Sequence, residues 1–307
     1  MIKAPMQQDA NECWTQFVRI LQQKLPAVRS GDENKEMTNG EASSRQSSLI
    51  DQYFGIQFQS TLKCTEAPDE PESVSTETLY QLSCFIDKDV KYLYTGLKNR
   101  LTETIHKNST SLGRNAEYLK TSLLKRLPAY LSIQFVRFYY KEKEKVNAKI
   151  LKDVKFPLTL DLLELCTPEL QKRLLPIREK FKEMDDKKLE EEKKAKLEGK
   201  KSGVNKMDVD SDVKEYQPYS FSDDTGSNNS GFYQLQAVLT HQGRSSSSGH
   251  YVAWIKGSNN SWIKCDDDKI THITEEDVLK LSGGGDWHCA YVLLYGPRRL
   301  EIIKESS

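Results

Sequence analysis

A histidine and an aspartate in the last quarter of the sequence are the strongest candidates for chemistry. His250 follows a Gly/Ser stretch, residues 243–249, and opens an apolar segment that predicts a strand. Asp266 directly follows the next predicted strand, residues 261–265. If the two strands are antiparallel neighbours, the carboxylate lies beside the imidazole, where it would hold one tautomer and stabilise the imidazolium. The spacing therefore indicates general-base chemistry, with the loop before His250 giving a substrate access.

Both residues also have simpler interpretations. A histidine beside a Gly/Ser loop is often only a polar surface residue, and three consecutive aspartates at 266–268 are typical of an exposed turn. The glycines at 283–285 are not followed by the Lys-Ser/Thr of a phosphate-binding loop, so they predict a turn as well. Residue types alone leave catalysis and a plain surface site both open.

The elements that must position the pair belong to a β-rich C-terminal region. Its strands are separated by turns rich in Gly, Ser and Asn, and residues 275–281 predict a short helix capped by Thr274. The four predicted strands are residues 232–241, 250–256, 261–265 and 287–296.

The N-terminal half mixes helices and strands. Apolar spacing predicts helices over residues 7–25 and 90–105, and the dense apolar run 127–140 predicts a strand buried on both faces. Residues 56–64 alternate like a strand, with residues 79–86 as the expected partner across an acidic connection. Two polar segments, about 29–48 and 185–215, predict disordered insertions. Together these patterns predict one α+β domain.

Composition excludes several classes of protein. Lys+Arg and Asp+Glu both total 45, so the formal net charge is zero and nothing favours a nucleic-acid partner. No run of about 18 apolar residues predicts a membrane span. The six cysteines include no C-x-x-C pair, so we expect no structural metal and free thiols in a reducing compartment, the cytoplasm or also the nucleus.

Five motifs, in order along the chain, resemble those of the ubiquitin-specific proteases. They are Gln-Gln-Asp-Ala-Asn-Glu at 7–12, Leu-Pro-x-x-Leu with Arg-Phe at 127–138, Gly-His-Tyr-Val at 249–252, Trp with Asp-Asp at 262–267, and Ala-Tyr-Val-Leu-Leu-Tyr at 290–295. The resemblance implies a papain-like cysteine protease fold of thumb, palm and fingers, without a cofactor. It implies hydrolysis of the bond after the C-terminal glycine of ubiquitin.

The resemblance also implies partners and roles. The partners are ubiquitin and ubiquitinated proteins, and the likeness to a proteasome-associated member adds the 26S proteasome regulatory particle. His250 would be the general base and Asp266 its orienting partner. Gln7 and Asp9 would help hold the extended, arginine-bearing ubiquitin tail. Asp9 could equally cap the helix that follows it, and the two roles are compatible.

Four further residues are candidates for contact with substrate. Ser246 and Ser247 lie in a run that resembles a loop covering the tail groove, although such a run is also typical of a flexible turn. His241 and Tyr251 are placed to line the cleft, but a structural role fits each of them too.

The family's cysteine box, with its nucleophile and a preceding asparagine, has no counterpart in this sequence. We expect Cys13 to pack as a small apolar side chain on its helix and Cys265 to face away from Asp266. The chain is therefore predicted to lack the first part of the thumb and to be inactive alone. The alternative is a catalytically dead module that binds ubiquitin or the proteasome. Without the first part of the thumb, the helix 7–25 should expose apolar surface, which would lower solubility.

Overall fold

The structure is a computed structural model of the 307-residue chain. It describes residues 8–28, 48–142, 145–197, 215–245, 248–258, 261–285 and 287–302.

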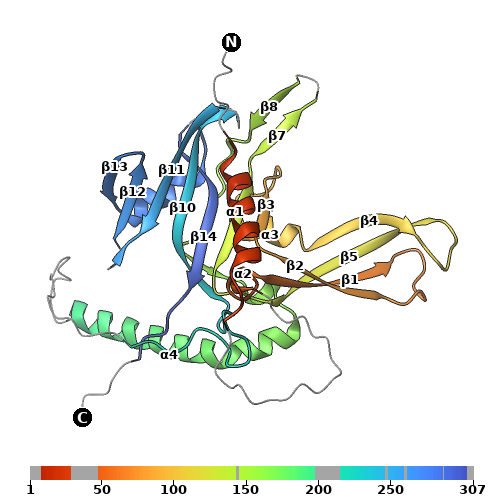
Figure 1. The fold of residues 1–307 in the computed structure, drawn as a ribbon. Coiled ribbons are helices and arrows are strands. Elements are labelled where there is room, and N and C mark those ends of the chain that lie inside the picture. The colour runs from red at the N-terminus through yellow and green to blue at the C-terminus, as the bar shows by residue number, and fades with distance from the viewer. Residues whose placement is uncertain are drawn as a thin grey trace.

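An eight-stranded sheet forms the centre of the molecule (Figure 1). Its order is β13-β12-β11-β10-β14-β6-β3, with β9 also paired to β10, and β3–β6 is its parallel pair. Burial is densest along β14, where eight of nine residues are buried. The strands are β3 (Leu82–Phe85), β6 (Leu131–Val136), β9 (Thr159–Asp161), β10 (Phe232–Ser245), β11 (Ser248–Lys256), β12 (Trp262–Asp266), β13 (Lys269–Ile273) and β14 (Cys289–Pro297).

A second sheet projects sideways from the first (Figure 1). It has the order β2-β1-β5-β4 and consists of β1 (Ile56–Cys64), β2 (Ser73–Leu79), β4 (Thr102–Asn108) and β5 (Asn115–Arg126). The prediction that residues 79–86 pair with β1 is wrong. Ser73–Leu79 takes that place, although every residue of it is exposed, while Leu82 and Cys84 are buried and bring β3 into the central sheet.

The strand predicted over residues 127–140 is two strands in different sheets. β6 ends at Val136, and β7 (Phe138–Lys141) pairs with β8 (Val146–Lys149) in a separate hairpin. Arg137 lies between them and is fully buried. Its guanidinium donates to the carbonyls of Ala290, Ile150, Lys152 and Ser282 at 2.7–3.0 Å. These bonds fix the point where the chain leaves the central sheet, because a buried guanidinium without acceptors would be very costly.

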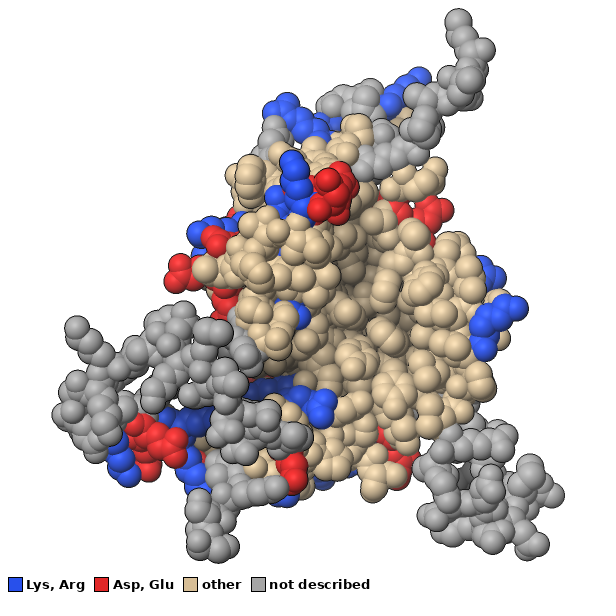
Figure 2. Space-filling view, turned by 60° about the vertical axis from the view of Figure 1, so that its left-hand side comes forward, with Lys and Arg blue, Asp and Glu red and all other residues tan. Residues whose placement is uncertain are grey.

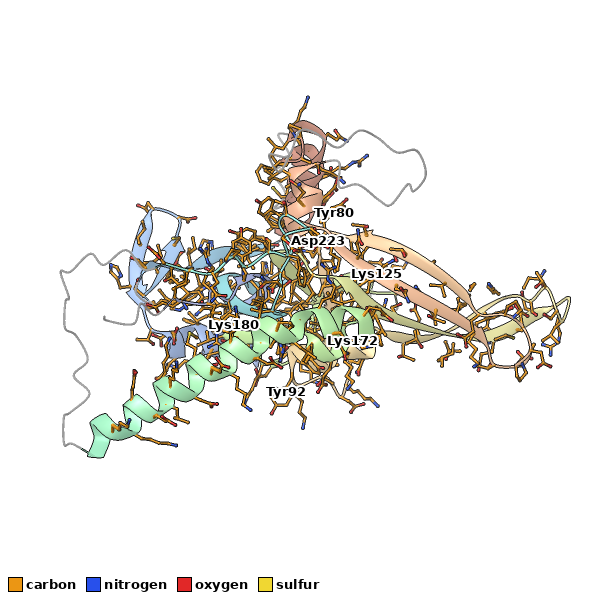
Figure 3. The ribbon with its side chains drawn as sticks, turned by 90° about the horizontal axis from the view of Figure 1, so that it is seen from below. Tyr80, Tyr92, Lys125, Lys172, Lys180 and Asp223 are labelled. Atoms are coloured by element: carbon orange, nitrogen blue, oxygen red, sulfur yellow. The ribbon has the colours of Figure 1, made fainter. Side chains whose placement is uncertain are left out.

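Helices surround the sheets: α1 (Ala10–Lys24), α2 (Leu49–Phe54), α3 (Leu93–Asn99), α4 (Pro168–Leu197) and α5 (Glu275–Leu279), with 3₁₀ turns η1 (Leu163–Leu165) and η3 (Lys280–Ser282). The predicted helix 90–105 is too long, since residues 102–108 form β4. Seen from below, α4 crosses the underside, with Lys172 and Lys180 along it, and its far end extends past the other elements (Figure 3). The predicted disorder of 185–215 is therefore wrong for 185–197, while residues 198–214 and 29–47 lie outside the described part.

The helix α1 leaves one face uncovered. Val18 is its buried residue and Trp14 packs edge-on against Phe54 of α2, whereas Phe17 and Ile20 are 52% and 54% exposed. Cys13 is exposed as well, so the prediction that it packs as an apolar side chain is wrong. A broad area without charged side chains occupies the middle of the face shown in Figure 2, with Lys, Arg, Asp and Glu at its margins. Among the described helices, none is both long and apolar enough to cross a membrane.

Candidate active site

Three neighbouring antiparallel strands bring His250 and Asp266 together. β11 pairs with β10 on one side and with β12 on the other, and Ala253 stands opposite Cys265 in the second pair. Asp266 ends β12, and its Oδ1 lies 2.6 Å from Nε2 of His250. The predicted juxtaposition of histidine and aspartate is present in the structure. Since both side chains are partly exposed, the pair is open to a substrate.

A lysine that sequence reasoning did not single out completes this group. Lys264 lies two residues before Asp266 on β12, and its Nζ is 2.7 Å from Oδ2 of Asp266. The Lys264 ammonium, and after it the hydrogen bond to His250, lower the pKa of Asp266 to about 2. The carboxylate is therefore ionised at any physiological pH. The period of two along a strand was the signal that could have found Lys264, because it places residues 264 and 266 on one face.

The ionised carboxylate decides how the imidazole is used. A carboxylate only accepts hydrogen bonds, so Nε2 of His250 must carry the proton that it donates to Oδ1. In the part of the chain that the structure describes, Nδ1 of His250 has no hydrogen-bond partner. Nδ1 is thus the nitrogen that can take a proton from a thiol, while Asp266 stabilises the imidazolium that forms.

His250, Asp266 and Asp267 are residue types that bind metal ions, but their surroundings do not favour a metal site. Ligand atoms of His250, Asp266 and Asp267 all lie within 4.8 Å of one another. However, Lys264 already contacts one Asp266 oxygen and His250 the other. An ammonium in direct contact with the carboxylate opposes a divalent cation, so the donor set suits proton transfer better than metal binding.

A buried network fixes the strands beneath the pair. Thr240 of β10 is fully buried, and its hydroxyl accepts from Trp254 Nε1 at 2.9 Å and donates to the Val252 carbonyl at 3.2 Å. His288 Nδ1 lies 3.3 Å from the same hydroxyl, and its ring meets Trp254 edge-on. Burial, and then the charge of Lys264, lower the pKa of His288. This network makes the floor of the site rigid and keeps a second imidazole neutral.

Asp9 and Tyr251 meet at the start of α1. Asp9 caps the helix, because its Oδ1 accepts from the amides of Asn11 and Glu12 at 2.7 and 3.2 Å. The hydroxyl of Tyr291 lies 2.8 and 2.7 Å from the two Asp9 oxygens, and the Ala10 amide donates to Tyr251 Oη at 3.4 Å. The capping interpretation of Asp9 is therefore confirmed, and the structure shows that these residues join α1 to β11 and β14. A role in holding substrate stays a prediction.

His241 is enclosed rather than open. It is fully buried on β10, with the rings of Phe138 and Tyr251 packed edge-on against it. Lys149 Nζ lies 3.2 Å from its Nδ1 and donates to its carbonyl at 2.5 Å. Burial, and then the Lys149 charge, lower the pKa of His241 to about 4. Its position supports a structural role behind Tyr251, whereas Gln7, Ser246 and Ser247 lie outside the described residues.

The cysteines differ sharply in environment. Burial raises the pKa of Cys84 and of Cys166 to about 12, so both are thiols at neutral pH. Cys64 and Cys289 are buried too, while Cys13 is exposed on α1. Cys265 is partly exposed, and strand alternation turns it away from the face that carries Asp266. A nucleophilic thiol needs an adjacent base or cation, and these positions argue against that role for the buried four.

Similarity to known proteins supports the assignment that the motifs indicated. The family model described as "Ubiquitin carboxyl-terminal hydrolase" matches residues 1–295. Ubiquitin carboxyl-terminal hydrolase 6 of Arabidopsis thaliana is 42% identical over 300 residues, 95% of this chain and 59% of that protein. Ubiquitin carboxyl-terminal hydrolase 14 of Caenorhabditis elegans is 45% identical over 257 residues, 83% of this chain and 52% of that protein. The chain thus spans little more than half the length of these relatives.

Solved structures support the fold. The structure of the SAGA Ubp8/Sgf11/Sus1/Sgf73 DUB module bound to ubiquitin aldehyde contains a chain that matches with a TM-score of 0.58 and 19% identity, covering 96% of this chain and 50% of that one. The same module bound to monoubiquitin matches with a TM-score of 0.59. At this identity the likeness concerns the fold alone, and it confirms the expected α+β, papain-like architecture. On the combined evidence of motifs, fold and sequence similarity, the chain belongs to the ubiquitin carboxyl-terminal hydrolase family.

Proposed function

We propose that this chain carries the general-base half of a cysteine-type deubiquitinase site, which hydrolyses the bond after the C-terminal glycine of ubiquitin. The observation that carries the proposal is the His250–Asp266 hydrogen bond of 2.6 Å, with Nδ1 of His250 left for the thiol. In the reaction, Nδ1 takes the thiol proton, the thiolate attacks the glycine carbonyl, and the imidazolium protonates the leaving amine.

The residues at the junction of α1 with β11 and β14 support ubiquitin as the substrate. Asp9, Tyr251 and Tyr291 form a connected polar and aromatic group where α1 meets β11 and β14. Asp9 places a carboxylate in this group, and an acidic side chain suits an extended tail that bears arginines. We therefore include Asp9 and Tyr251 among the substrate contacts, with Gln7, Ser246 and Ser247 as further candidates.

The nucleophile is proposed to come from outside the six cysteines of this sequence. Four of them are buried, and for two of these a raised pKa of about 12 disfavours the thiolate. The same observation favours the second candidate function, a catalytically inactive module that binds ubiquitin. The proposed setting is proteasomal protein turnover in the cytoplasm or nucleus, with ubiquitinated proteins and the proteasome regulatory particle as partners.

Titration of the chain with ubiquitin tests the proposal. We expect ubiquitin to bind, ubiquitin without its C-terminal Arg-Gly-Gly to bind more weakly, and Asp9→Asn to lower affinity for intact ubiquitin by about tenfold, the value of one charged hydrogen bond. Glu12→Gln, an exposed acidic change in the same helix turn, is the matched control. Equal affinity for the intact and shortened forms, or no binding by a folded chain, would contradict ubiquitin-tail recognition here.

A further inference from the structure

Lys264 occupies a position from which it can control the geometry of the catalytic pair. It faces Trp254 on β11 and Thr271 on β13 in the strand register, so both neighbours flank it. Its ammonium lies 5.5 Å from the centre of the Trp254 ring and 2.7 Å from Oδ2 of Asp266. Only 25% of the lysine side chain is exposed. The surroundings therefore aim the ammonium at one carboxylate oxygen.

The carboxylate needs such a second contact. Asp266 is the last residue of β12 and pairs with Lys269 across a tight turn in which Asp267 has a positive φ of 53°. A short side chain at a strand end rotates readily unless both oxygens are held. Asp267 also places a carboxylate oxygen within 4.8 Å of the imidazole, so a competing acceptor is close by. Holding Oδ2 determines which carboxylate, and which oxygen, faces His250.

We propose that Lys264 is a positioning residue for the reaction: it holds Oδ2 of Asp266 so that Oδ1 stays on Nε2 of His250 and Nδ1 remains the base. This role in catalysis rests on the proposed deubiquitinase function, whereas the His250–Asp266 hydrogen bond can be measured without any enzymatic activity. A partly exposed ion pair contributes little to stability, so the fold does not require this contact. The contact between Lys264 and Asp266 instead fixes the geometry of the His250–Asp266 hydrogen bond, which sets the imidazole tautomer.

Proton NMR of the 307-residue chain tests the geometric step. We expect a strongly downfield resonance from the His250 Nε2 proton, identified by its loss in His250→Gln. Lys264→Met should move this resonance upfield or remove it through exchange, and Lys264→Arg should restore it, because a guanidinium can hold the same oxygen. Lys269→Met removes a positive charge at the adjacent turn and should leave the resonance in place. An unchanged resonance in a folded Lys264→Met or Lys264→Leu variant would overturn the proposal.

Kinetics then test the catalytic step separately. In a preparation that contains this chain and cleaves a ubiquitin–fluorophore conjugate, Lys264→Met should lower kcat by about 10- to 100-fold with little change in KM, and Lys264→Arg should recover most of it. A kcat within twofold of the wild type, despite loss of the downfield resonance, would overturn the positioning role. Absence of cleavage by the wild type would count against the proposed function alone, because the NMR result would still decide the geometric step.

Discussion

Two histidines on adjacent strands show how burial and a charged neighbour together decide what an imidazole can do. His241 on β10 is fully buried beside the ammonium of Lys149, and its pKa is lowered to about 4. His250 on β11 is partly exposed and donates to the carboxylate of Asp266. The two rings belong to one sheet, yet a cation faces the first and an anion the second.

Neither a place in the sheet nor the presence of a histidine is therefore enough to identify a general base. A cation disfavours the imidazolium that a general base must form, and a carboxylate favours it. His241 is thus suited to packing behind Tyr251, and His250 to proton transfer. For His241, burial lowers the pKa most and the Lys149 charge adds to it, whereas His250 is distinguished by its carboxylate partner.

The largest expected effect comes from Asp266→Asn. An amide cannot stabilise the imidazolium as a carboxylate does, and general-base catalysis typically contributes about 10²–10⁴-fold. We therefore expect kcat/KM to fall by a factor in that range in an active preparation that contains this chain. Asp268→Asn, in the exposed turn beyond, is the control. A loss of less than threefold in Asp266→Asn would mean that another group orients His250.

The buried histidine should appear in the pH dependence of stability. The pKa of His241 is about 4 in the folded chain against an ordinary 6.5, so only the unfolded state binds this proton at mildly acidic pH. Its stabilisation is complete above about pH 6.5 and is lost as pH falls towards 4. We expect the contribution of His241 to lower the unfolding free energy, measured by urea titration, by about 1–2 kcal/mol between pH 7 and pH 5.

His241→Gln should flatten that pH dependence, because glutamine does not titrate. His272→Gln, on the exposed strand β13, provides the matched control. If unfolding free energy depends on pH equally in His241→Gln and the wild type, protonation of His241 on unfolding is not the cause of that dependence.

A smaller effect is expected where β14 contacts the start of α1. Tyr291→Phe removes the hydroxyl that contacts both Asp9 oxygens, but Asp9 keeps the amides of Asn11 and Glu12. We expect a loss of about 1.5 kcal/mol in unfolding free energy, at the lower end of the range for a hydrogen bond to a charged group, because the two amide donors remain. Tyr140→Phe, on an exposed strand of the β7–β8 hairpin, should change stability by less than about 0.5 kcal/mol. Equal effects would show that the Tyr291–Asp9 contact contributes nothing.

The smallest effect concerns the cation beside His241. Lys149→Met should raise the pKa of His241 above 4, because the ammonium lowers it, yet leave it below 6.5, because burial is the larger cause. Histidine ring NMR measures this directly, with the exposed Lys155→Met as a control. A pKa that stays at 4 would assign the whole shift to burial and remove Lys149 from the comparison.

The contact between His250 and Asp266 was predictable because strand alternation and a short hairpin connection act over short range. The bounds of β1, Ile56–Cys64, also agree with the alternating pattern. By contrast, β2 is exposed along its whole length and so carries no apolar period to detect. The contact of Tyr291 with Asp9 joins residues 282 positions apart, and no local pattern encodes such a distance. Lys264 was detectable by alternation but looks like an ordinary exposed lysine in the sequence.

Whether any of the six cysteines is the nucleophile can be measured by intact mass after incubation with ubiquitin propargylamide, which captures an active-site thiolate. The claim is that this chain supplies the base and its partner while none of its six cysteines is the nucleophile. It predicts that the folded chain binds the probe and gains no mass. A stoichiometric adduct would contradict it, and peptide mapping to Cys13 or Cys265 would identify the thiol that His250 activates.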